Sequence, residues 1–222
     1  MVFSLFRRGD ADGLEAAEAK LVQMLADDRH SFDVATATLL TGADTSVVGP
    51  DIRESDSRVN RAERELRQAL VVHASVHGTS RVAAILVYMS VVKDVERIGD
   101  YAKNIYDVAA QGVNLSDAPD HAVLIEYRDR ISSMISEAST IFAKDDREAA
   151  ADFIKEADEL LDEFDGHVSA LVVSEAPGKE AVPRALLFRY YKRIVAHLMN
   201  LLSAVVMPLD RLDYFDEERV RP

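Results

Sequence analysis

Apolar residues recur every three or four positions through most of this chain, which is the period of an α-helix. The first such stretch runs from Leu14 to Leu40, and the second runs from Val59 to His73, with Gly78 as its stop signal. The third is expected from about Arg81 to Ala110. A glycine shortly after the last periodic residue is a common helix terminator. The first half of the chain therefore predicts three helices.

Three more helical stretches follow in the second half. They cover Ile125–Lys144, Asp146–Val173 and Arg184 to about Leu209. Loops are expected at 41–51, 112–121 and 174–183, because these segments collect the glycine and proline residues that interrupt helices. No alternating strand pattern of comparable length occurs. The predicted fold class is all-α, as two tandem three-helix bundles over residues 1–111 and 121–222, joined by a linker at 112–120.

The two halves resemble each other. The segment ERIGDYAKNIYDVA (96–109) aligns with KRIVAHLMNLLSAV (192–205) at an offset of 96 positions. Arg97 then matches Arg193, and Asn104 matches Asn200. Equally spaced self-similarity is the signature of a repeated unit. We interpret the chain as a duplicated three-helix unit.

Composition limits the kind of partner and the compartment. The 222 residues include 48% hydrophobic and 29% charged residues, which is typical of a globular protein. The net charge is −13 and neither half is basic, which argues against binding nucleic acid. The absence of cysteine excludes disulfides and thiolate sites and fits a cytoplasmic protein. The longest apolar run, Val82–Val92, is too short to span a membrane, so membrane association is expected only through a partner.

One stretch of the third helix has an unusual charge pattern. On a helical wheel, Glu96, Asp100 and Asn104 form a single polar stripe opposite an aliphatic face. A solvated surface is one interpretation, although like charges four positions apart cost roughly 0.2–0.5 kcal/mol. The other interpretation is a cation site, because carboxylate and amide oxygens suit hard cations. Such a site needs a second helix, and the preceding one offers polar residues at i, i+4 and i+7: Asp56, Asn60 and Glu63.

The same stretch, DVERIGDYAKNI, resembles the signature of the PhoU family, the regulators associated with bacterial and archaeal phosphate uptake. The residues that carry the resemblance are Asp94, Glu96, Arg97, Ile98, Gly99, Asp100 and Asn104. The upstream D-x-x-x-N-x-x-E pattern is also similar to the family, as are the length, the six helices and the duplication. The resemblance covers most of residues 14–209 and is strongest at 94–105.

The resemblance implies two three-helix bundles packed side by side and a regulator without known catalysis. It implies partners, namely a phosphate transporter complex and a sensor kinase, and we also expect a homodimer. Some family members hold iron or zinc clusters at E-x-x-x-D motifs, which here correspond to Glu96 and Asp100. We therefore expect iron, zinc or another divalent cation. The predicted metal ligands are Glu96, Asp100, Asn104, Asp56, Asn60 and Glu63, and the predicted partner-binding residues are Asp94, Arg97 and Arg193.

The second repeat departs from the signature. Lys192 and Ala196 stand where the pattern has glutamate and aspartate. A lysine ammonium repels a metal ion and alanine has no ligand atom, so the second repeat is predicted to have lost its metal site while it kept the fold. His197, at the repeat position of Tyr101, is expected to be a packed or capping histidine.

Other functions are open at this point. His73 and His77 lie four positions apart and could bind zinc, or His77 could simply end its helix. A carboxylate-rich metal-binding bundle, a regulator of a different ion transporter, and a structural bundle that dimerises through a helix face are alternatives. No serine lies in a G-x-S-x-G elbow, and no glycine-rich loop is present that would bind phosphate or a nucleotide. Together with the resemblance, this predicts a protein that is not an enzyme.

Overall fold

The computed structural model describes residues 11–212, and over this range it is helical without a strand. This confirms the all-α prediction. The six long helices are α2 (Ala11–Thr41), α3 (Thr45–His77), α4 (Val82–Ala110), α5 (His121–Lys144), α6 (Arg147–Val172) and α7 (Gly178–Val206). Two short 3-10 helices, η1 (Gly78–Arg81) and η2 (Leu209–Arg211), follow α3 and α7. No helix within this range is long and apolar enough to cross a membrane.

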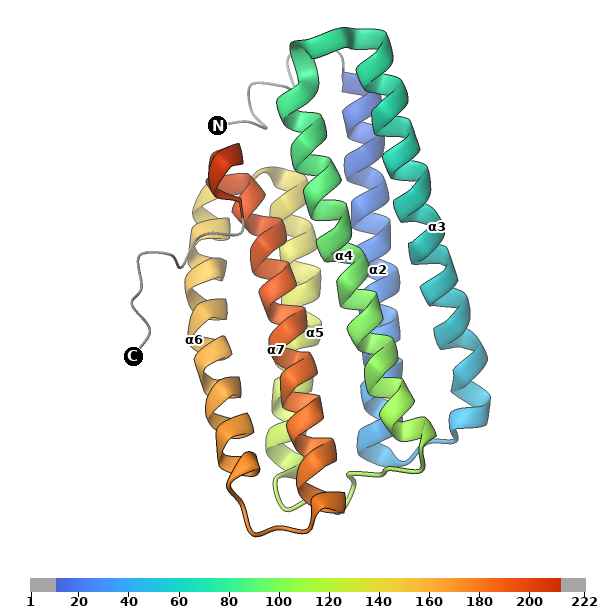
Figure 1. Ribbon diagram of the computed structural model, residues 1–222, viewed down its shortest axis with the longest axis vertical. Coiled ribbons are helices and arrows are strands. Elements are labelled where there is room, and N and C mark those ends of the chain that lie inside the picture. Colours follow the sequence, from blue (N-terminus) through green and yellow to red (C-terminus); the bar gives the residue numbers. More distant parts are fainter. Residues whose placement is uncertain (1–10, 213–222) are drawn as a thin grey trace.

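The helices form two groups of three that lie side by side (Figure 1). The first unit contains α2, α3 and α4, and the second contains α5, α6 and α7. Helices α2, α4, α5 and α7 occupy the middle of the molecule, whereas α3 and α6 lie on its two outer sides (Figure 1). The units meet where α4 packs on α7 and α2 packs on α5.

Both units share one apolar core. The ring of Phe32 in α2 lies 5.8 Å from the ring of Tyr191 in α7, and both side chains are fully buried. Tyr191 also lies 6.0 Å from Phe164 in α6. Tyr88 of α4 meets Phe142 of α5 edge to face at 6.4 Å. Aromatic pairs at these distances contribute beyond the area they bury, so the interface between the units belongs to the core.

The two central helices α4 and α7 correspond closely. Each has 29 residues; they begin at positions 82 and 178 and end at positions 110 and 206, which keeps the offset of 96 along their whole length. They run in opposite directions where they pack (Figure 1). This arrangement supports the duplication inferred from the sequence and pairs each residue of α4 with a counterpart in α7.

Two predicted loops are partly helical. Helix α3 begins at Thr45, inside the segment expected to be a loop at 41–51, and α7 begins at Gly178, inside the one expected at 174–183. Pro50 and Pro183 are each the sixth residue of their helix. Proline keeps a helix-compatible φ and loses only one backbone hydrogen bond near a helix start. The expectation that proline ends these segments was therefore wrong.

Candidate functional site

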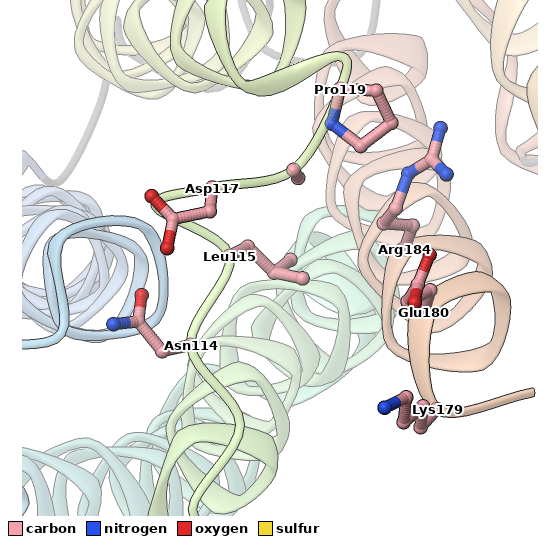
Figure 2. Close-up of a pocket in the computed structure, with 8 residues that line it drawn as sticks. Asn114, Leu115, Asp117, Pro119, Lys179, Glu180 and Arg184 are labelled. Carbon is pink, nitrogen blue, oxygen red and sulfur yellow. The ribbon is translucent and has the colours of Figure 1, made fainter. Parts of the chain in front are cut away.

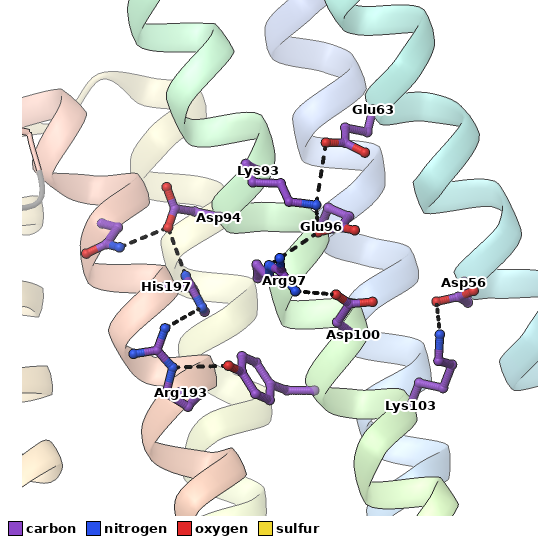
Figure 3. Close-up of polar contacts among 12 residues, drawn as sticks. Asp56, Glu63, Lys93, Asp94, Glu96, Arg97, Asp100, Lys103, Arg193 and His197 are labelled. Carbon is purple, nitrogen blue, oxygen red and sulfur yellow. Dashed lines mark hydrogen bonds and ion pairs between the residues drawn. The ribbon is translucent and has the colours of Figure 1, made fainter.

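Helix α4 presents polar side chains on two of its faces (Figure 3). Glu96 and Asp100 point toward the first unit's own helices, while Asp94 points across to α7 (Figure 3). Residues three and four apart share a helix face, and a step of two moves to another face. We call the first set, Asp56, Glu63, Glu96 and Asp100 between α3 and α4, the acidic seam. The set between α4 and α7 is the inner network, formed by Asp94, Tyr101, Arg193, His197 and Asn200.

The upper part of the acidic seam is joined by a lysine. Lys93 Nζ lies 2.6 Å from Glu96 Oε2 and 3.8 Å from Glu63 Oε1. Arg67 adds a second cation, with NH2 3.1 Å from the same Glu63 oxygen. Glu63 and Glu96 are themselves largely buried, at 8% and 7% exposure. Helix α3 thus brings Glu63 to the same lysine as Glu96 of α4.

The lower part of the seam follows the same pattern. Lys103 Nζ lies 3.1 Å from Asp56 Oδ1, and Asn60 donates to Asp56 Oδ2 over 3.2 Å. Arg97 NH1 lies 3.0 Å from Asp100 Oδ2. Burial lowers the pKa of Lys103, but its hydrogen bond to Asp56 and the nearby carboxylates outweigh burial, so the pKa is raised from 10.5. The carboxylates around Lys103 therefore favour its charged form.

The six predicted metal ligands lie along this seam, with Asn104 partly buried one turn beyond Asp100. Among the side chains that the structure describes, no three or more histidine or acidic side chains are placed to hold an ion. The outer carboxylates are each paired with lysine or arginine. The donor types suit an oxygen-liganded cation, but lysine and arginine side chains occupy the places a cation would take.

One carboxyl near the seam has no hydrogen-bond partner among the residues that the structure describes. Asp28 of α2 is fully buried, and neither of its oxygens accepts a hydrogen bond. It faces Gly99 of α4, where a Cβ atom would come within 2.4 Å of Asp28 Oδ1. The sequence contained a signal for it, since Asp28 falls between Leu25 and Phe32 on the apolar stripe of its helix. The polar neighbours of Asp28 in the segment DDRH conceal its buried position in the sequence.

The surroundings of Asp28 disfavour its charged form. Burial comes first, followed by the negative charges of Asp27, Glu96, Asp100 and Asp56; together they raise the pKa of Asp28 well above 3.8. A buried carboxylate without a hydrogen bond or cation is strongly unfavourable. Asp28 therefore requires a positive charge or a proton at this position.

The inner network links the two units. His197 of α7 lies with Nδ1 2.8 Å from Asp94 Oδ1, and Asn200 donates to the same oxygen over 2.9 Å. Arg193 NH2 lies 3.3 Å from His197 Nε2. Since arginine can only donate, His197 accepts at Nε2 and donates from Nδ1 to Asp94. His197 is thus a packed histidine, as expected, and it joins α7 to α4.

Arg193 completes the inner network from the side. Its Nε donates to the hydroxyl of Tyr101 over 3.2 Å, and the Tyr101 ring stacks on His197 at 5.8 Å. Asp94 is 8% exposed. Of the three residues predicted to bind a partner, Asp94 and Arg193 thus lie in the chain's own interface, whereas Arg97 has 48% of its side chain exposed.

The second unit shows what replaced the acidic stripe. Lys192, the counterpart of Glu96, forms an ion pair with Asp165 of α6. Ala196 is partly buried against the core, and Val195, the counterpart of Gly99, is fully buried. In α7 an aliphatic side chain fills the place that Gly99 leaves open in α4, so a carboxyl cannot approach α7 at this position.

Two further features stand apart from the seam. The His77 side chain lies outside the described residues, so the predicted pairing of His73 with His77 is untested. A pocket of about 240 Å³ lies under the linker, lined in part by Asn114, Lys179 and Arg184 (Figure 2). Arg184 is already held by Asp120, with NH2 at 2.6 Å from Oδ2. This pocket offers little free positive charge for an anion.

The fold and the seam define a class: a duplicated three-helix protein whose central helix carries E-R-I-G-D. Residues 21–109, within the first unit, match the family model described as the PhoU domain. The first unit of the chain therefore carries a PhoU domain. The crystal structure of PhoU from Pseudomonas aeruginosa is similar over both units, with a TM-score of 0.75 and 22% identity, covering 90% of this chain and 97% of that one. A comparison with curated proteins found no match.

Proposed function

We propose that this protein regulates phosphate transport without catalysis, as a cytoplasmic adaptor between a phosphate transporter and a sensor kinase. The observation that carries the proposal is the PhoU-domain match over residues 21–109, which includes the seam helix and its E-R-I-G-D motif. The similarity of the whole fold to PhoU from Pseudomonas aeruginosa is consistent with it. The name of that protein and the family model together point to phosphate uptake.

The arrangement of polar groups favours a binding role. The motif's carboxylates are paired with cations of the same chain, and none of them lies in the pocket of Figure 2. General acid or base catalysis needs a side chain within hydrogen-bond reach of a bound substrate. A net charge of −13 also disfavours direct binding of phosphate. The regulator would respond to phosphate through its partners.

Deletion of the gene from its host tests this proposal. Phosphate uptake and expression of a phosphate-regulated reporter would be measured in high and low phosphate, with the wild-type gene restored as a control. We expect uptake or reporter expression to lose its dependence on external phosphate. Unchanged uptake and expression at every phosphate level would count against the proposal. A change confined to another ion would assign the protein to a different transporter.

Arg97 is the predicted partner-binding residue that remains accessible. We propose that it contacts the kinase or the transporter, because arginine is enriched at the energetic centres of interfaces. Arg97→Ala should weaken binding to the purified partner domains by about tenfold. The matched control is Arg61→Ala, an exposed arginine of α3. Equal binding by both variants would remove Arg97 from the interface.

The homodimer expected from the sequence stays a prediction. Light scattering of the purified chain over a range of concentrations tests it, because a stable homodimer keeps twice the mass of the chain on dilution. A mass equal to one chain at all concentrations would contradict it.

A further inference from the structure

An apolar groove lies on the first unit, between the first turns of α2 and the last turns of α3. Its volume is about 520 Å³, and most of its lining is small or aliphatic, including Ala16 and Ala17 of α2 and Ala69, Val72 and Val76 of α3. Val72 and Val76 are 57% and 71% exposed. Contiguous apolar surface in water is typical of a site that binds another apolar segment.

The charges on the two sides of the groove differ. On the α3 side, the chain has no aspartate or glutamate between Glu65 and Asp94, although it contains 39 acidic residues in total. At the start of α2 the sequence is acidic instead, with Asp12 and Glu15, and Glu15 is exposed. A segment that is apolar along α3 and basic next to α2 would therefore complement both sides.

The segment that precedes α2 has this composition. Residues 1–8 read MVFSLFRR, in which the large apolar side chains come first and two arginines follow. Gly9 and Asp10 then connect the arginines to Ala11, where α2 begins. Glycine and aspartate are common where a chain turns back. Residues 1–8 lie outside the described range, and the match is one of sequence, length and point of attachment.

The segment is attached beside the groove and is long enough to cover it. Ala16 is five positions after Ala11, which is about 7.5 Å along the helix. On α3 the lining extends from Gln68 to Val76, which is about 12 Å. Eight extended residues reach about 26 Å. Because the segment is tethered, its effective concentration at the groove is far above that of a separate molecule.

We propose that the N-terminal segment 1–8 of this chain docks in the groove between α2 and α3. Phe3, Leu5 and Phe6 supply the apolar side chains that cover the exposed valines of α3. Arg7 and Arg8 come next to the acidic start of α2. The groove is thus the binding site of the chain's own N-terminus, and it lies apart from the acidic seam and the inner network.

Disulfide trapping in the full chain tests this placement. The protein contains no cysteine, so an introduced pair reports a single contact. The test pair is Phe3→Cys with Val72→Cys, and the matched control is Phe3→Cys with Val71→Cys. Val71 is 58% exposed, as against 57% for Val72, but it does not line the groove. The two pairs therefore differ in the face of α3 and hardly in the length of the tether.

The purified variants are oxidised with glutathione disulfide at low protein concentration and followed by non-reducing electrophoresis and mass spectrometry. We expect a disulfide within one chain, formed about tenfold faster with Val72→Cys than with Val71→Cys. Equal rates would leave the groove to another molecule and overturn the proposal. A disulfide that joins two chains in the test pair would also overturn it, because a second copy would then supply the occupant.

Thermal melting gives a second, independent readout without cysteines. Phe3→Ser combined with Phe6→Ser should lower the melting temperature by about 2–4 °C, as expected when apolar contacts of a chain of this size are lost. In a background that carries Val72→Ser and Val76→Ser, the same pair should have little further effect, because the contacts are already gone. An unchanged melting temperature in the wild-type background contradicts the proposal, and so does an equal drop in both backgrounds.

Discussion

Helices α4 and α7 are two copies of one helix that now perform different tasks. Both are 29 residues long, and both cross the centre of the molecule. On the side that faces the rest of the first unit, α4 has Glu96, Gly99 and Asp100. At the corresponding positions α7 has Lys192, Val195 and Ala196. Since both helices fold and pack equally well, the acidic motif is not needed for the bundle. Its retention in α4 alone points to a role in binding.

The faces on which α4 and α7 contact each other have also diverged. Each changed residue still contacts a residue of the other helix. The offset of 96 maps Asp94 onto Tyr190 and Tyr101 onto His197. The contact of Asp94 with His197 is thus the counterpart of the contact between Tyr190 and Tyr101, whose rings lie 6.0 Å apart. One contact is a hydrogen bond to a carboxylate, and the other is aromatic. The two contacts therefore still occupy positions related by the repeat, although the side chains that form them differ in chemistry.

The largest effect is expected from removing Asp94. Asp94→Ala leaves the donors of His197 and Asn200 buried without an acceptor, and breaking a buried pair costs about 3 kcal/mol. Urea unfolding followed by circular dichroism measures this loss. Tyr190→Phe at the counterpart position should cost less than about 1 kcal/mol, because it keeps the ring contact. Equal losses would show that the two contacts are energetically alike.

Filling the space at Gly99 is expected to have the next largest effect. Gly99→Ala gains helix propensity but places a methyl group against the buried carboxyl of Asp28, for a net loss of about 1–2 kcal/mol of unfolding free energy. Gly166→Ala in α6 is the control, because its Cβ would meet no atom within 4 Å. That variant should gain about 0.5–1 kcal/mol.

A second substitution tests the cause of the Gly99 effect. Asp28→Ala removes the atom that the new methyl group meets, so Gly99→Ala should be much less harmful in that background. Double-mutant analysis of the unfolding free energies gives the coupling. An unchanged cost of Gly99→Ala in the absence of the Asp28 carboxyl would place the clash elsewhere.

The raised pKa of Asp28 predicts a pH effect in metal-free buffer. The folded protein keeps this proton at pH values where the unfolded chain, with a pKa near 3.8, has lost it. Stability from the protonated group is therefore present below pH 3.8 and is lost as the pH rises toward the folded pKa. Asp28→Asn cannot lose a proton, so its melting temperature should exceed that of wild type increasingly from pH 4 upward. A constant difference across this range would contradict the raised pKa.

The smallest effect is expected at Lys192. Lys192→Met removes the ion pair with Asp165, whose side chain is 47% exposed, so the cost should stay below about 1 kcal/mol. Lys93→Met in α4 should cost more, because Glu96 is nearly buried and loses its closest cation. Thermal melting of the two variants side by side measures this difference. The reverse order would mean that α7 depends on its ion pair more than α4 does.

Much of the fold could be predicted because the apolar period is nearly unbroken. The ends of α4 follow from Gly78 and Gly112, and its counterpart follows from the repeat. The starts of α3 and α7 could not be predicted as well, since Pro50 and Pro183 were treated as breakers although both lie near a helix start. Proline in that position is compatible with a helix, and local sequence alone does not separate the two cases.

The seam was predictable from spacing on α3 and α4, because polar residues four apart must share a face. Asp28 was not found, because its role depends on which helix packs against it. Likewise, the sequence predicted Asp94 and Arg193 as partner-binding residues and did not show that they lie between α4 and α7. That position arises from the packing of α4 on α7, which brings together residues about 100 positions apart.

The junction between the units has an evolutionary consequence. Each copy covers apolar surface of the other and supplies hydrogen-bond partners to it. Examples are the contact of Phe32 with Tyr191 and the hydrogen bond between Asp94 and His197. A shortened gene encoding only one copy would expose that surface to water and leave Asp94 without its donors. The ancestral duplication therefore became irreversible once the copies had diverged at their junction. After that point, α7 could lose the acidic motif only because the motif lies on the side of the helix that faces away from α4.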